Sequence, residues 1–191
     1  MPILLKILGI KAIGTVISIV IFITKSGPSL TTPDILIYED SVRVETTLKK
    51  AFSKGLDEII KSGSEVGIFY NIELLEKDEQ GLARLLFEKT IRQYIVFQPS
   101  TNEYIISLLD DSELSINDLD SAKVLLSKIG INMIVVDRIK VECDYQVRLT
   151  AALNTIEIEA IDAKHFDLNA FWNFKYPMKN TKWIPGKEIA P

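Results

Sequence analysis

Residues 3–24 form an apolar stretch whose only charged side chains are Lys6 and Lys11. Two lysines followed by an uncharged run are typical of an export signal, so this stretch constrains where the rest of the chain can fold. The uncharged run, residues 12–24, would cover about 20 Å as a helix, which is short for a hydrocarbon core of about 30 Å. A helix that starts at Ile7 and turns Lys11 back to the head groups would cover about 27 Å, enough for a thin bilayer.

We interpret residues 1–25 as an uncleaved signal-anchor or transmembrane segment. A cleaved signal is the first alternative, although the small residues available before a cut, Thr24 with Ser26 or Gly27 with Ser29, do not form the preferred Ala-x-Ala pattern. A buried strand is the second alternative, because residues 16–21 are rich in β-branched side chains. The positive-inside rule keeps the two lysines in the cytoplasm. We therefore expect a single-pass protein of the cytoplasmic membrane with its domain outside the cytoplasm, or a secreted or periplasmic domain if the signal is cleaved.

The remainder of the chain has the size and charge of one acidic domain. We expect a linker at residues 26–33 and an extracytoplasmic α+β domain at residues 34–191. After residue 29 the sequence holds 19 basic and 26 acidic side chains, a net charge of −7. Nucleic acid is excluded as a partner on this ground, because phosphate binding requires a basic surface. The single cysteine, Cys143, cannot form a disulfide within the chain.

Alternation of apolar and polar side chains predicts that most of the domain is antiparallel β-sheet, in which one face of each strand is packed and the other is wet. The segment 35–48 is typical of a strand pair or of one bent strand, and the segment 85–97 is typical of a strand near the edge of a sheet. The other predicted strands are 66–74, 104–108, 131–136, 139–153 and an aromatic strand at 171–176.

Two amphipathic helices are expected against this sheet. The first carries its apolar stripe from Leu48 to Ile60 and ends at Ser62-Gly63, where glycine can adopt a left-handed conformation. The second follows a Ser115-x-x-Asp118 capping box and closes at Gly130. The predicted fold class is therefore α+β, mainly antiparallel sheet with two amphipathic helices and with a sandwich as one open arrangement, preceded by the N-terminal membrane or signal helix.

No catalytic, cofactor or metal site is predicted. His165 is the only histidine and is interpreted as a surface-loop residue, and no G-x-S-x-G or nucleotide-binding motif occurs. The acidic residues 110–115 lack the spacing of a calcium loop. Cys143 is interpreted as a small core residue on the buried face of the predicted strand 139–153.

Four segments in order support a family resemblance. They are a helix followed by Ser-Gly and a strand at residues 59–69, a hairpin at 92–104, a Tyr-x-x-Arg strand that ends in leucine at 145–153, and a tryptophan-containing segment at 171–183. This order resembles an uncharacterised bacterial domain-of-unknown-function family whose members are exported and carry a signal or a membrane anchor. The resemblance implies a compartment and a fold, and no activity.

The C-terminal aromatic residues are the candidate binding residues. Aromatic side chains are common anchors of interfaces, and we expect Trp172, Phe174 and Trp183 to contribute to a partner-binding surface. The expected function is a non-catalytic, membrane-tethered binding or scaffolding module with a protein partner in the envelope. The alternative is an envelope hydrolase with an unrecognised carboxylate pair.

Overall fold

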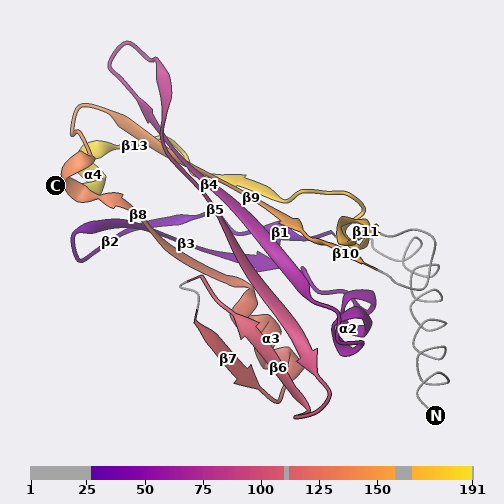
Figure 1. Cartoon of the computed structure of the whole chain (residues 1–191). Helices are drawn as coiled ribbons and strands as arrows, with labels where there is room; N and C mark the ends of the chain where they lie inside the picture. The colour runs from indigo at the N-terminus through magenta and orange to yellow at the C-terminus, as the bar shows by residue number, and fades with distance from the viewer. Residues whose placement is uncertain (1–26, 110–111, 158–164, 191) are drawn as a thin grey trace, which may run out of the picture.

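The structure, a computed structural model, describes residues 27–109, 112–157 and 165–190 (Figure 1). The expected signal-anchor, residues 1–25, and the acidic pair Asp110 and Asp111 lie outside the described residues. The rest folds mainly into antiparallel β-sheet with few helices, which confirms the predicted fold class. None of the helices in these three ranges is long and apolar enough to cross a bilayer.

The larger sheet has seven strands and is organised around β4 (Val66–Lys77). β4 pairs with β5 (Ala83–Gln98) along one side and with β9 (Asp144–Leu153) along the other. The remaining strands are β6 (Glu103–Ser107) and β7 (Glu113–Ile116), which follow β5, and β12 (Met178–Asn180) and β13 (Ile184–Pro185), which pair with β9.

The smaller sheet has four strands around β3 (Ser41–Lys49). Its other strands are β8 (Lys128–Val135), β2 (Asp34–Tyr38) and β1 (Ser29–Leu30). The segment 35–48 therefore forms a strand pair, one of the two arrangements that its pattern allows. The pairing of Leu30 with Leu48 means that the folded domain begins within the expected linker. A two-stranded sheet, β10 (Thr155–Glu157) with β11 (His165–Asp167), completes the described strands.

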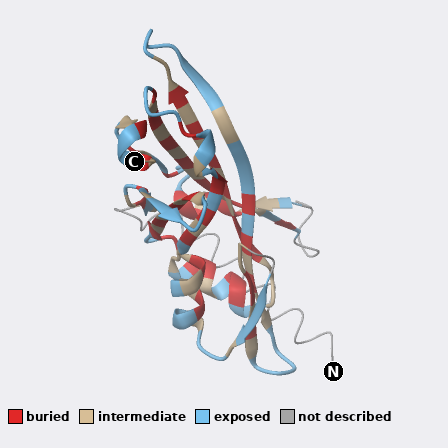
Figure 2. Ribbon diagram, turned by 90° about the vertical axis from the view of Figure 1, so that its left-hand side faces the viewer, coloured by how far each residue is buried: buried red, intermediate tan, exposed pale blue. Residues whose placement is uncertain are grey.

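Both large sheets contribute their apolar faces to one hydrophobic core (Figure 2). Alternate residues of β3, β4 and β9 are buried, as the period of two requires when one face of a strand is packed. Helices α2 (Lys54–Lys61) and α3 (Leu119–Leu126) bury apolar residues in the same core. The hydroxyl of Tyr70 on β4 donates to the carbonyl of Leu126 at the end of α3, so this buried polar group is satisfied. The short helix α4 (Gly186–Ile189) follows β13.

The first helix is shorter than predicted. Ser53 is its N-cap and accepts a hydrogen bond from the backbone N–H of Leu56, and Leu48 belongs to β3 instead. A period of two and a period of 3.6 both place Leu48 on the buried side, so the pattern alone did not separate strand from helix. The predicted end is confirmed, because the helix stops at Ser62 and Gly63 has a φ of +85°.

The second helix also differs from its prediction at both ends. Asp118 caps it through the backbone N–H of Ser121, whereas Ser115, the expected partner in a capping box, lies in β7. The helix ends at Ser127, and Gly130 is a residue of β8. The prediction that residues 119–129 are helical was wrong for the last turn, because β8 takes that segment into its pairing with β3.

One predicted strand, 139–153, starts later than expected, and another, 171–176, is not a strand. Residues 136–138 form a 3₁₀ helix (Val136–Arg138), a loop follows to Cys143, and β9 starts only at Asp144. The aromatic segment 171–176 is not a strand, because a 3₁₀ helix (Leu168–Trp172) leads into a turn. Alternation would place Phe171 and Trp172 on opposite faces, but both are buried. The turn exists because Asn173 and Phe174 adopt left-handed backbone conformations, with φ of +54° and +52°.

The outer part of β5 lies at the edge of the larger sheet. β5 pairs with β6 only from Tyr94 to Gln98, so residues 83–93 have a strand partner on the β4 side alone within the described structure. The predicted edge position is therefore confirmed for this part of the strand. With the end of β4, it projects beyond the rest of the domain as a long hairpin (Figures 1 and 2).

Replacement of Trp172 by alanine should strongly destabilise the domain. Trp172 is 1 % exposed and its indole Nε1 donates to the carbonyl of Ala51 at 2.8 Å. Removal of a buried aromatic side chain typically costs about 3–5 kcal/mol. Phe174→Ala is the control two residues away, and its effect should stay within about 0.5 kcal/mol because the side chain is exposed. Equal losses for the two variants in urea unfolding would contradict this assignment of core and surface.

Candidate functional site

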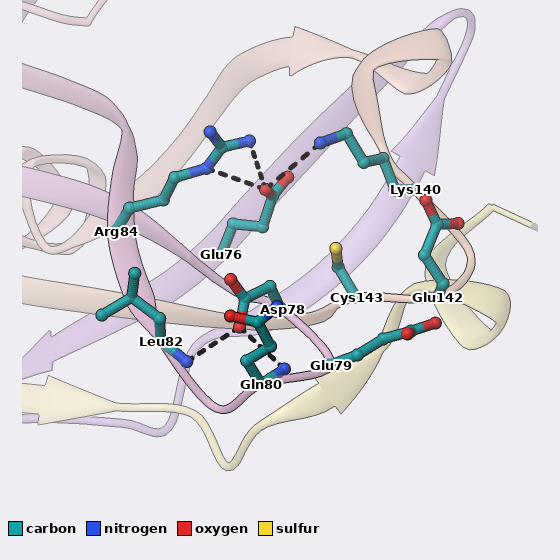
Figure 3. Close-up of a pocket in the computed structure, with 9 residues that line it drawn as sticks. All are labelled: Glu76, Asp78, Glu79, Gln80, Leu82, Arg84, Lys140, Glu142 and Cys143. Atoms are coloured by element: carbon teal, nitrogen blue, oxygen red, sulfur yellow. Dashed lines mark hydrogen bonds and ion pairs between the residues drawn. The ribbon is translucent and has the colours of Figure 1, made fainter.

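A pocket of about 400 Å³ lies where the β4–β5 hairpin meets the loop before β9 (Figure 3). The end of β4 and the hairpin turn contribute Glu76, Asp78 and Glu79, and β5 contributes Arg84. The loop contributes Lys140, Glu142 and Cys143. Charged groups of both signs therefore surround one cavity.

A β-bulge gives Arg84 its place in this pocket. Leu74 pairs with Phe87, but the next residue, Leu75, pairs with Leu85, so Leu86 is an extra residue on β5. With regular pairing, Arg84 would stand opposite Lys77, with its side chain on the outer face. The bulge moves it opposite Glu76, on the inner face. One inserted residue thus brings a guanidinium to a buried carboxylate.

Glu76 is the centre of the pocket and is 1 % exposed. Its Oε1 accepts hydrogen bonds from Nε of Arg84 at 2.9 Å and from Nη2 of the same side chain, and Nζ of Lys140 lies 3.5 Å away. Its Oε2 accepts from the hydroxyl of Tyr145 at 3.0 Å. Both oxygens of the carboxylate therefore have partners, as a buried charge requires.

The balance of these interactions keeps Glu76 ionised. Burial alone would raise the pKa of its carboxyl, because it disfavours the charged form. The hydrogen bonds from Arg84 and Tyr145, together with the charges of Arg84 and Lys140, outweigh burial and lower the pKa below its usual value of 4.5. A carboxyl group of this kind is a poor general acid near neutral pH.

The loop that carries Lys140 and Cys143 is held from two sides. The backbone N–H of Lys140 donates to the hydroxyl of Tyr145 on β9, the same hydroxyl that reaches Glu76. On the other side, the N–H of Gly186 donates to the carbonyl of Cys143 at 2.7 Å. A Cβ at Gly186 would collide with the carbonyl oxygen of Lys140, so only glycine allows α4 to approach this closely.

Cys143 is buried as predicted, at 4 % exposure, but it lies in this loop and not on a strand. Burial, followed by the negative charge of Glu76, raises the pKa of its thiol. The thiolate is the nucleophilic form of cysteine, so this environment disfavours nucleophilic chemistry. His165 is exposed on β11 and does not line the pocket.

Within the three described ranges, no group of three or more His, Cys, Asp and Glu side chains is arranged to hold a metal ion. The two carboxylates of the hairpin turn, on Asp78 and Glu79, have environments different from that of Glu76. Oδ1 of Asp78 accepts from the backbone N–H groups of Gln80 and Leu82 and closes the hairpin turn. Glu79 is exposed at the tip of the same turn.

The three predicted partner-binding residues lie in three different environments. Trp172 is in the core, and Phe174 is exposed on the turn before β12. Trp183 is half-buried next to β13, where the ammonium of Lys77 lies 4.8 Å from its ring centroid. They therefore do not form one surface, and a docking role for Phe174 or Trp183 stays a prediction.

Glu76, Arg84 and Lys140 are not among the residues that the sequence patterns select as candidates. A signal for Glu76 was present, since the alternation of β4 continues through Leu74 and places residue 76 on the buried face. A carboxylate at a buried position requires a cationic partner. The identity of that partner was not accessible, because it depends on the bulge in β5.

The Glu76 cluster should make stability depend on pH. Because the pKa of Glu76 is lowered on folding, its ionised form favours the folded state above pH 4.5, and this contribution is lost as the pH falls through the lowered value. Glu76→Gln should reduce the free energy of unfolding by about 1–3 kcal/mol at pH 7, and the difference from wild type should shrink in acid. Glu79→Gln is the exposed control. A difference that does not change between neutral and acidic pH would contradict the assignment.

Gly186→Ala should expose Cys143. The native thiol should resist alkylation and react on denaturation, whereas the added methyl group would displace the Lys140–Cys143 loop and speed native labelling. Gly81→Ala is the matched control, because Gly81 has nothing within 4 Å of a Cβ, although its φ of +84° also penalises alanine. Equal labelling of both variants would mean that general destabilisation, and not the loop, governs access to the thiol.

Comparison with known proteins identifies the family. Residues 25–180 match the model of a family described as Domain of unknown function (DUF4390). The comparisons with curated proteins and with solved structures found no significant match. The matched residues include every strand of the two large sheets except β13, as well as every residue named above in the pocket, and they confirm the resemblance to an uncharacterised domain family. The chain therefore belongs to the DUF4390 family.

Proposed function

We propose that this protein is a non-catalytic binding module, tethered to the cytoplasmic membrane by its N-terminal segment and active outside the cytoplasm. The tether is inferred from the apolar residues 3–24 and from the two lysines that precede the uncharged run. The binding activity is inferred from one structural observation, the open edge of β5.

An open strand edge is a binding element in itself. Along residues 83–93 of β5, backbone N–H and C=O groups on the side away from β4 have no neighbouring strand in the described part of the chain. An extended segment of a partner can pair with such groups and add a strand to the sheet. Leu82 and Leu85 are exposed at the outer end of this edge and offer apolar contacts for the partner's side chains.

The charges at the hairpin support binding over catalysis. A hydrolase with two carboxylates needs one of them protonated near neutral pH, and this requires an environment that raises its pKa. Glu76 is the buried carboxylate of the pocket, and Arg84, Tyr145 and Lys140 hold its pKa down. The cluster fixes the base of the hairpin and so holds the open edge in place.

Site-specific photo-cross-linking in intact membranes tests this function. A benzophenone amino acid at Leu85, next to the open edge, should give a discrete cross-linked protein species. The matched control is the same substitution at Val124, which is similarly exposed but lies on α3. The partner identified from the Leu85 product should then protect the amides of residues 83–93 from hydrogen exchange, because strand addition pairs them.

Two results would contradict the proposal. Equal cross-linking from Leu85 and Val124 would mean that the edge has no specific partner. Protection of the side chains around Leu85 without protection of the amides of residues 83–93 would mean that the partner does not add a strand.

A further inference from the structure

A second surface of the domain combines exposed apolar side chains with lysines. Phe174, Tyr176 and Met178 are 60 %, 55 % and 60 % exposed, and Lys175, which follows Phe174, and Lys179, which follows Met178, are exposed as well. We call these five residues the basic aromatic surface. They occupy the turn after the 3₁₀ helix and the start of β12, an edge strand of the larger sheet, where the successive residues Met178 and Lys179 point to the two sides of this edge.

The fold presents this surface in one fixed conformation. The N–H of Phe174 donates to the carbonyl of Asn169, and the N–H of Lys175 donates to the carbonyl of Trp172. Trp172 itself is anchored in the core. A left-handed backbone conformation is unfavourable for a bulky residue such as Phe174, yet these contacts hold it there with its ring exposed. Strained residues of this kind cluster at functional sites.

The sequence around this surface is basic, although the whole chain is acidic. The sequence from residue 168 to residue 187 contains Lys175, Lys179, Lys182 and Lys187 and no acidic residue, in a chain whose net charge is −4. A basic segment on an acidic protein is suited to an anionic partner. Aromatic side chains beside lysines are typical of the membrane–water interface, where the rings lie at the level of the head groups.

The basic aromatic surface lies beside the point where the chain leaves the N-terminal apolar stretch. Gly27 lies next to the side chain of Lys175, since a Cβ added to Gly27 would be 3.4 Å from its Cδ, and β1 lies beside β12. Thr24, the last residue of the apolar stretch, is three residues from Gly27. The basic aromatic surface is therefore next to the residue at which the described domain begins, three positions after the apolar stretch.

We propose that the basic aromatic surface rests on the membrane, with Phe174, Tyr176 and Met178 at the head-group layer and Lys175 and Lys179 bound to anionic lipid phosphates. This inference rests on the proposed tether, which places residues 3–24 in the same bilayer. It also orients the domain. β9 runs from Ala151, beside Pro177, to Tyr145, beside Glu76, a distance of about 20 Å along the strand. The Glu76 pocket and the outer end of the open edge, around Leu85, then lie away from the lipid.

Fluorescence quenching on the full-length chain tests the proposal. The variant Phe174→Cys is labelled with an environment-sensitive dye and reconstituted with vesicles of mixed phosphatidylglycerol and phosphatidylcholine. Val124→Cys is the matched control on α3, and the wild-type chain, whose Cys143 is buried, gives the labelling blank. In mixed vesicles the fluorescence of the label at position 174 should be protected from quenching by acrylamide, and that of the label at position 124 should not.

The lysines provide the test of lipid charge. Lys175→Gln and Lys179→Gln should each reduce the ratio of protected to accessible label roughly fivefold, the effect of one basic residue near an anionic surface, and high salt should act in the same direction. Equal protection in pure phosphatidylcholine would contradict the role of anionic lipid. Equal quenching at positions 174 and 124 in mixed vesicles would overturn the proposal.

Flotation with pure phosphatidylcholine vesicles separates this inference from the tether. A chain that floats with these vesicles but leaves position 174 accessible in mixed vesicles is tethered without the proposed contact, and the inference fails alone. A chain that does not float with them but is protected at position 174 in mixed vesicles has the contact without the tether, and the proposed anchor fails alone.

Discussion

The structure depends on the alternation of buried and half-buried residues along β4, which holds from Ile68 to Lys77. This strand is paired on both sides, and from Ile68 onward every second residue is buried. The period of two does not stop where the apolar residues stop, so Glu76 is carried into the interior. A buried carboxylate is stable only when it is paired and hydrogen-bonded, and the end of the hairpin is built to meet that requirement.

Three separate segments supply the groups that compensate the buried charge of Glu76. The bulge at Leu86 turns Arg84 inward, the loop before β9 brings Lys140, and Tyr145 joins the loop to the carboxylate. Gly186 allows α4 to close the same loop from behind. The ion cluster is therefore a junction between the hairpin and the body of the domain. Its charges are satisfied internally, which is the arrangement expected of a supporting element and not of a group that exchanges protons with a substrate.

The two proposed contacts divide the domain into a lipid side and a partner side. The first is defined by Gly27, Lys175 and the exposed aromatic residues around them, and the second by the open edge of β5. A tether alone leaves a domain free to rotate above a membrane. A second contact with the lipid would fix its orientation and would hold the outer end of the β5 edge away from the bilayer.

The sequence by itself determined the α+β class, most of the alternating strands, the β5–β6 hairpin and the end of the first helix at Gly63, because each of these depends on neighbouring residues. It also indicated that Cys143 is buried. Only the tertiary structure decided the start of that helix, the 3₁₀ helix that buries both Phe171 and Trp172, and the separation of Phe174 from Trp183. It also decided the pairing of Glu76 with Arg84, since this depends on one extra residue in β5 and on a loop that is more than 50 residues away in the chain. Local patterns specify which side of an element is buried, whereas partners across the fold are specified by register and packing, which no single segment encodes.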